Sequence, residues 1–153
     1  MKNVFKVGVI FSLFCILVCQ SCSKSNVKKS ADSVDVPVVL QAGPWTVSSL
    51  MQRSENKSSQ FEGYVFTFSP GGTLKVEKSG SIISGSWLYT PSAVVYYGAT
   101  GSTASVTIQI ASSTALSRLN KRWNIDSLHT SASTLTLVSP EVAEQETVIF
   151  VRQ

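Results

Sequence analysis

The sequence predicts an all-β domain, specifically an eight-stranded antiparallel up-and-down barrel with one short helix before the sixth or seventh strand. Apolar and polar residues alternate along several short segments, as they do in strands that bury one face. Turn-forming residues separate these segments at short intervals, which is typical of consecutive antiparallel strands that close into a small barrel. Charged residues make up only 14% of the 153 residues and hydrophobic residues 43%, a composition that suits a single exported β-rich domain.

The first half of the domain contains four predicted strands. The first covers residues 45–52 ("WTVSSLMQ"), and a polar loop follows it. Residues 64–68 ("YVFTF") place three aromatic side chains on one face. In the "SPGG" stretch, Pro70 fixes a negative φ and Gly71 takes a positive φ, which predicts a tight turn into the strand at 73–78. The fourth strand covers 82–90, where Gly85 is expected to leave room for the ring of Trp87.

The second half is less regular. Residues 93–105 ("AVVYYGATGSTAS") predict a short strand and a long loop, and residues 106–111 alternate cleanly. A helix of one or two turns is expected around Leu116 and Leu119, with Ser113 or Thr114 as its cap. The remaining strands are predicted at 123–129, 134–139 and 146–151.

The first 21 residues have the form of a secretory signal peptide. Two lysines precede an apolar run from Val7 to Val18, which is too short to span a bilayer. The "CQSC" stretch that follows resembles the lipobox of bacterial lipoproteins, although Cys19 stands where leucine is more usual. The resemblance implies that Cys22 becomes the first residue and carries lipid, and two or more acyl chains give stable anchoring. The alternative is a plain secreted protein that is cut near Cys22.

A polar tether is expected over residues 22–41, and the barrel domain over 42–153. The tether is mixed in charge and lacks periodicity, which is typical of a flexible linker. Its last part, "DVPVVL", could pair as a first edge strand, although Pro37 weakens that interpretation.

Several classes of site are excluded by the distribution of residues. No cysteine follows Cys22, so we expect neither a disulfide, nor a thiol redox pair, nor a cysteine zinc site in the barrel. No metal site and no cofactor are expected, because a metal site would need carboxylates around the single histidine, His129. Removal of the leader lowers the formal charge from +4 to +2, and no basic cluster interleaved with aromatic residues suggests nucleic-acid binding.

The order of short motifs along the chain resembles the lipocalin-like lipoproteins of Gram-negative bacteria. The resemblance runs from Gly43 to Arg152 and rests on "GPWTVSSL", "FEGYVFTFSPGGTLKV", "SGSW", "LNKRWNIDSLHTSASTLTLV" and "ETVIFVR". It implies an eight-stranded lipocalin-like barrel and an outer-membrane lipoprotein, but no particular ligand. The chain departs from the pattern at residues 93–105, where a shorter connection is expected.

The interior of such a barrel is either filled by side chains or holds one small ligand. Six aromatic residues are predicted to point inward and are candidates for either role, with the filled core favoured: Tyr64, Phe66, Phe68, Trp87, Tyr89 and Trp123. Tyr96 and Tyr97 are candidates for contact with a protein partner, because two adjacent tyrosines cannot both face one core. An ordinary buried strand is the alternative for this pair.

The "DSLH" stretch contains the residue types of a hydrolase triad. On a strand, Asp126 would point away from Ser127 and His129 and could not orient the imidazole, so no catalytic residue and no enzymatic activity are expected. Ser33 in "DSV" resembles a bacterial O-glycosylation site, and its alternative is a plain linker serine.

Taken together, these features predict a lipid-anchored, non-enzymatic envelope protein that binds a small apolar ligand or an envelope component. The alternative is a protein-interaction module, such as a complex subunit or an inhibitor, with a filled barrel that acts through its rim loops.

Overall fold

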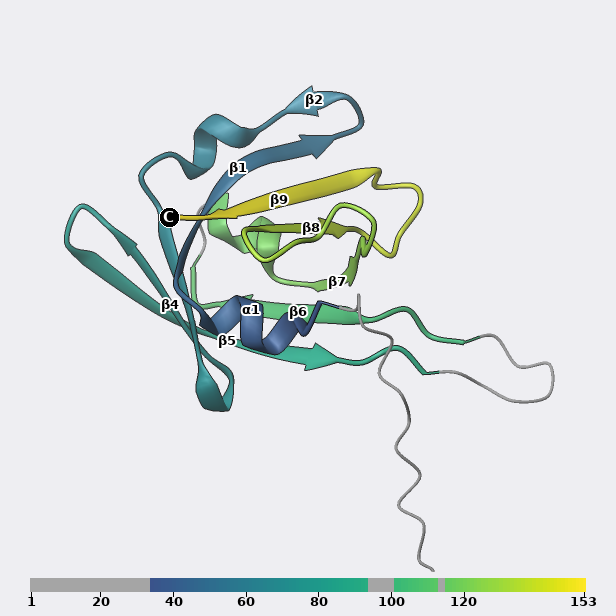
Figure 1. Ribbon diagram of the computed structural model, residues 1–153. Coiled ribbons are helices and arrows are strands. Elements are labelled where there is room, and N and C mark those ends of the chain that lie inside the picture. The colour runs from purple at the N-terminus through teal and green to yellow at the C-terminus, as the bar shows by residue number, and fades with distance from the viewer. Residues whose placement is uncertain (1–33, 94–100, 113–114) are drawn as a thin grey trace, which may run out of the picture. The chain divides into compact units, whose positions relative to one another are not determined.

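Nine antiparallel strands form one sheet that closes on itself (Figure 1). The computed structural model describes residues 34–93, 101–112 and 115–153, and the compact unit begins at Val34. The strands are β1 (Pro44–Gln52), β2 (Glu55–Asn56), β3 (Val65–Ser69), β4 (Thr73–Lys78), β5 (Ser81–Thr90), β6 (Ser105–Ile110), β7 (Arg122–Ile125), β8 (Thr134–Val138) and β9 (Glu146–Arg152).

Eight of the strands make up the barrel. They pair with their neighbours in chain order, and β1 pairs with β9 to complete the closure. The ninth, β2, pairs only with the end of β1, where Arg53 and Ser54 take positive φ values in the tight turn between them. The prediction of an eight-stranded antiparallel up-and-down barrel is therefore confirmed, with one short strand added at its rim.

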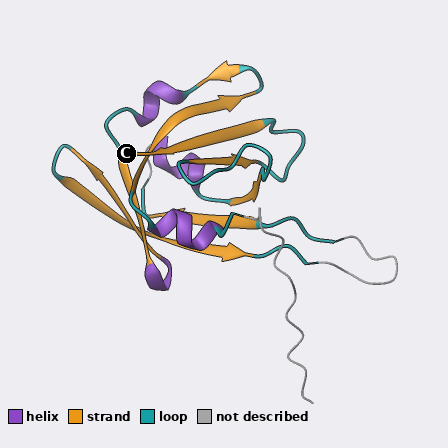
Figure 2. Cartoon of the chain, viewed as in Figure 1, coloured by secondary structure: helices purple, strands orange, loops and turns teal. Residues whose placement is uncertain are grey.

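The helical segments are all short (Figure 2). Three are 3₁₀-helices, η1 (Ser58–Phe61), η2 (Pro70–Gly72) and η3 (Ala115–Leu119). The last lies before β7, the sixth barrel strand, so the predicted position of a short helix is confirmed; its expected caps at 113–114 lie outside the described residues. No helix in the described ranges is long and apolar enough to cross a membrane.

Helix α1 (Val36–Gln41) differs from the sequence prediction. The "DVPVVL" stretch is helical and not an edge strand, because Pro37 lies in the first turn, where its missing N–H costs nothing. Val36 and Leu40, one helical turn apart, are buried in the barrel core, and the Leu40 carbonyl accepts a hydrogen bond of 2.9 Å from the Trp45 indole. The last part of the predicted tether therefore belongs to the barrel unit, and the predicted domain boundary at residue 42 lies too far along the chain.

The core follows the alternation predicted for each strand. Leu74 and Val76 point inward from β4, while Lys75 lies on the outer face. Gly85 in β5 lies opposite Leu74, but its role differs from the prediction. A Cβ atom at Gly85 would collide with the backbone carbonyl of Gln109 on β6. Glycine is therefore required here by the close approach of the neighbouring strand, whereas the prediction had assigned that reason to the ring of Trp87.

Strand β7 is shorter than predicted, because the chain turns after Ile125. The Asp126 carboxylate accepts a hydrogen bond of 3.0 Å from the Leu128 backbone N–H, a local turn that competes with extended structure. Residues 126–129 therefore lie in a loop and not on a strand.

Candidate functional site

The six aromatic residues predicted to line or fill the barrel all contribute to its core. Phe66, Phe68 and Trp123 are fully buried, Trp87 is 7% exposed, and Tyr64 and Tyr89 pack against the core while half-buried. Phe68 makes edge-to-face contacts with Trp87 (5.7 Å between ring centroids) and with Phe150 (6.1 Å). The six aromatic residues therefore pack into the barrel core, which favours the filled interior over a ligand cavity.

The indole N–H groups of two of these core residues are hydrogen-bonded. The Trp87 indole N–H donates to the Ser69 carbonyl at 3.0 Å, and the Trp123 indole N–H donates to the Leu119 carbonyl at 3.0 Å. Among the described residues, no buried side-chain nitrogen or oxygen lacks a hydrogen-bond partner. These buried polar atoms are therefore not free to orient a ligand inside the barrel.

A groove of about 500 Å³ lies on the outside of the barrel, beside β5. It forms where β5 extends beyond β4, because the pairing of these two strands ends at Ser86 opposite Thr73 while β5 continues to Thr90. A second hollow of about 540 Å³ shares Ser86 and Gln109 with it and continues over the outer faces of β5 and β6. The groove itself is lined by Gln41, Gly71, Gly72, Ser86, Trp87, Leu88, Tyr89, Thr107 and Gln109.

Two glycines of η2 form one wall of the groove. Gly71 and Gly72 have φ values of 78° and 82°, which glycine adopts without strain, and the positive φ predicted for Gly71 is confirmed. A Cβ atom on Gly72 would lie 2.8 Å from the carbonyl oxygen of Trp87, whereas one on Gly71 would meet nothing within 4 Å. Gly72 therefore lets the β3–β4 turn approach the backbone of β5 closely.

The chemistry of the groove is neutral, because none of its nine lining residues carries a charge. Leu88 is its most exposed apolar side chain, at 64%. Gln41, Gln109 and Thr107 add amide and hydroxyl groups to the lining of the groove. The groove can therefore bind uncharged groups through both apolar contact and hydrogen bonds.

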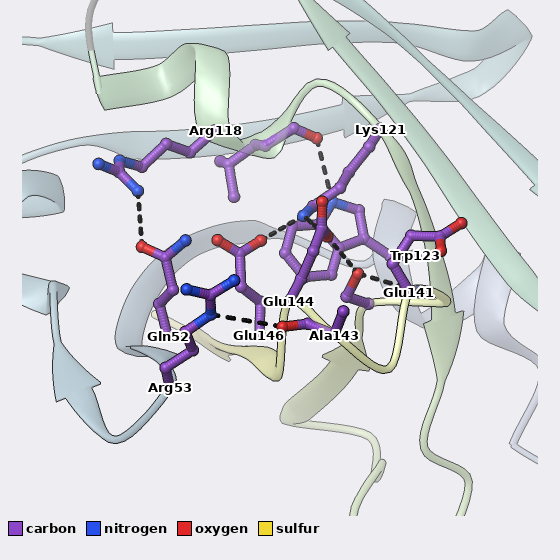
Figure 3. A network of polar contacts seen from close by, with 11 residues as sticks. Gln52, Arg53, Arg118, Lys121, Trp123, Glu141, Ala143, Glu144 and Glu146 are labelled. Atoms are coloured by element: carbon purple, nitrogen blue, oxygen red, sulfur yellow. Dashed lines mark hydrogen bonds and ion pairs between the residues drawn. The ribbon is translucent and has the colours of Figure 1, made fainter.

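A cluster of charged side chains lies instead between β7 and the β8–β9 connection (Figure 3). The Lys121 ammonium contacts the carboxylates of Glu144 (2.5 Å) and Glu146, and lies 4.6 Å from the centre of the Trp123 ring. Burial opposes the charge on Lys121, but the hydrogen bonds that its ammonium donates to both carboxylates outweigh this effect and raise the pKa of the amine. The hydrogen bond from Lys121 in turn lowers the pKa of Glu144.

This charged cluster joins several segments of the barrel unit. Arg53 and Arg118 reinforce it from other segments, through bonds to the Ala143 carbonyl (3.4 Å) and to the Gln52 side chain (3.0 Å). Each of these charged groups already has a partner within the protein. We therefore assign the cluster a structural role and do not treat it as a candidate binding site.

The "DSLH" residues do not lie as predicted. The Asp126 carboxylate contacts Nδ1 of His129 at 2.7 Å, so the expectation that it points away was wrong, because the turn after Ile125 brings the two together. The contact with His129 lowers the pKa of Asp126. Ser127 is exposed and makes no hydrogen bond to His129 among the described contacts, so these three residues do not form a triad.

Other predicted site residues lie outside the described part of the chain. These are Cys22, Ser33, Tyr96 and Tyr97. Within the described part, no three histidine, cysteine, aspartate or glutamate side chains come together as a metal site.

The fold places the chain among closed up-and-down β-barrels. The solved structure of a DUF4847 family protein from Bacteroides vulgatus has a similar fold, with a TM-score of 0.50, 14% sequence identity, and a match that covers 77% of this chain and 97% of that protein. At this identity the similarity concerns the fold alone. No family model matches the chain, and neither does any curated protein sequence.

The sequence prediction missed the groove as a site. The sequence predicts Trp87 and Tyr89 as interior residues. It predicts only a turn at Gly71 and Gly72 and a strand at Leu88, and assigns no binding role to these three. One signal was present: the predicted strand at 82–90 is longer than its neighbour at 73–78, so part of it must extend past the shorter strand.

Proposed function

We propose that this protein is a lipid-anchored, non-enzymatic interaction protein of the Gram-negative envelope, which binds its partner through the groove beside β5. The observation that carries the proposal is the contrast between a filled barrel and an open groove. The core aromatic rings occupy the space in which a lipocalin-type ligand would lie. The groove of about 500 Å³ is within the range of binding pockets.

Anchoring at the outer membrane rests on the leader and on Cys22. Palmitate or a similar acyl chain on Cys22 would hold the mature chain at the membrane. Twelve residues from Cys22 to Ser33 precede the compact unit, and at full extension they reach about 40 Å. The groove would therefore lie within reach of envelope proteins and lipids.

A small apolar ligand is the second candidate for the groove. Trp87, Leu88 and Tyr89 contribute apolar surface there, and convergent polar groups could orient a ligand. The same groove would then be used, but for a small molecule in place of a protein.

The test is native mass spectrometry of the full-length protein, extracted from its membrane in mild detergent. We compare wild type with Leu88→Glu and with the control Ile82→Glu, which changes an equally exposed residue (60% against 64%) of the same strand outside the groove. A co-purifying molecule that is lost only in Leu88→Glu supports the proposal, and its mass separates a protein from a small ligand. A bound molecule that persists in Leu88→Glu, or the absence of any bound molecule in wild type, contradicts it.

A further inference from the structure

Among the described residues, β5 has a stretch of unpaired strand edge. We call the four residues Trp87–Thr90, on their side facing away from β6, the open edge. At its first residue Gly72 lies close to the Trp87 carbonyl oxygen, so the backbone groups that a partner could reach are those of Tyr89. On the other side the four residues pair with β6, in the register Trp87 opposite Ile108 and Tyr89 opposite Val106. Beyond Ser86 no strand among the described residues lies on the β4 side. At a strand rise of about 3.3 Å per residue, the open edge is about 13 Å long.

The hydrogen-bonding groups of Tyr89 point toward this open edge. The Ile108 N–H bonds the Lys121 carbonyl on the far side of β6, so Ile108 and Trp87 form a non-hydrogen-bonded pair. The two types of pair alternate along the strand, so Tyr89, two residues after Trp87, also forms a non-hydrogen-bonded pair with its partner on β6. Its N–H and C=O therefore face away from β6, into the space where β4 has ended.

Two other segments of the barrel unit border the space beside the open edge. Gly71 and Gly72 of η2 line one part of it, and Gln41 at the end of α1 lines another. A second copy of this barrel would have to bring its own η2 turn and α1 helix to the same place. A single extended segment enters without that obstruction.

The side chains around the open edge define the chemistry of the segment. They are amides, hydroxyls and apolar groups without charge, so a charged side chain in the incoming strand would lose hydration without gaining a partner. Leu88, on the outer face, offers apolar contact to alternate side chains.

We infer that the groove takes an extended, uncharged segment of an envelope protein, which adds a strand to β5 along Trp87–Thr90. Backbone hydrogen bonds to Tyr89 fix the segment, and Leu88 selects for apolar side chains. This inference rests on the proposed function and specifies the partner that the groove binds.

The test uses the full-length protein in detergent micelles with synthetic octapeptides. In these peptides threonine alternates with Val, Leu, Ile, Phe or Tyr, and both ends are blocked so that no charge remains. NMR-detected amide exchange follows the Tyr89 N–H. We expect saturating peptide to slow exchange at Tyr89 by at least about tenfold. The protection should be lost in Leu88→Glu and kept in Ile82→Glu.

Three results would overturn strand addition. In the first, no peptide of the set protects Tyr89, while the co-purifying molecule still depends on Leu88; the proposed function then survives and the partner is of another kind. In the second, peptides N-methylated along one edge protect Tyr89 as well as the parent peptides, so backbone hydrogen bonds are not used. In the third, Tyr89 is already protected without peptide in a protein that sediments as a dimer, so a second copy is the occupant.

Discussion

Replacement of Phe68 by alanine tests whether the barrel is filled. Phe68 lies on β3 with 2% of its side chain exposed, and its ring contacts both Trp87 and Phe150 edge to face. Large-to-small changes of a buried phenylalanine cost about 3–5 kcal/mol, and the cost is highest where neighbours cannot move into the space. The closed barrel restricts such movement, and two ring contacts are lost together. We therefore expect Phe68→Ala to reduce the free energy of unfolding by about 4 kcal/mol.

The assay is urea unfolding of the full-length chain followed by tryptophan fluorescence, which reports on Trp87 next to the substituted ring. Leu88→Ala is the control, because an exposed side chain should contribute less than about 1 kcal/mol. A loss below about 1 kcal/mol in Phe68→Ala would refute the filled interior, since it would mean that the ring already borders empty space. A dye or lipid that binds wild type within the barrel would refute it as well.

Three further predictions concern the charged cluster, the groove wall and the anchor. Lys121→Met leaves the buried carboxylate beside it without a partner and should cost about 3 kcal/mol in urea unfolding, whereas Lys75→Met in an exposed pair should cost less than about 1 kcal/mol; equal losses would contradict the structural role of the cluster. Gly72→Ala should lower the melting temperature more than Gly71→Ala, because both have positive φ but only Gly72 would bring its Cβ against the β5 backbone. Cys22→Ser should abolish palmitate incorporation and release the protein from membranes, and labelling of this variant would contradict the anchor.

Much of the barrel could be predicted because its strands obey a local rule. Alternation with a period of two places Phe66, Phe68, Leu74 and Val76 inside without knowledge of any other segment. The turn at Pro70 is equally local, since backbone preference alone determines it. These features account for the correct strand number and order.

The errors arose where particular side-chain contacts, and not the alternation of apolar and polar residues, decide the structure. The "DVPVVL" stretch has residues that favour a strand, yet it is helical because Val36 and Leu40 meet the barrel core together. Strand β7 ends early because the Asp126 side chain bonds the backbone of the following turn. The groove forms because β5 is longer than β4 and because η2 lies beside the end of their pairing. It therefore could not be predicted from any single segment of the sequence.

The central claim is that this protein binds on the outside of its barrel, at the groove beside β5. Site-specific photo-crosslinking in intact cells that express the protein tests it most directly, with p-benzoylphenylalanine at position 88 and, for comparison, at position 82. These side chains lie on the same strand with similar exposure, 64% and 60%, and only Leu88 lines the groove. We predict a discrete adduct from position 88 and none from position 82. Equal adducts from both positions, or none from position 88, would contradict the claim.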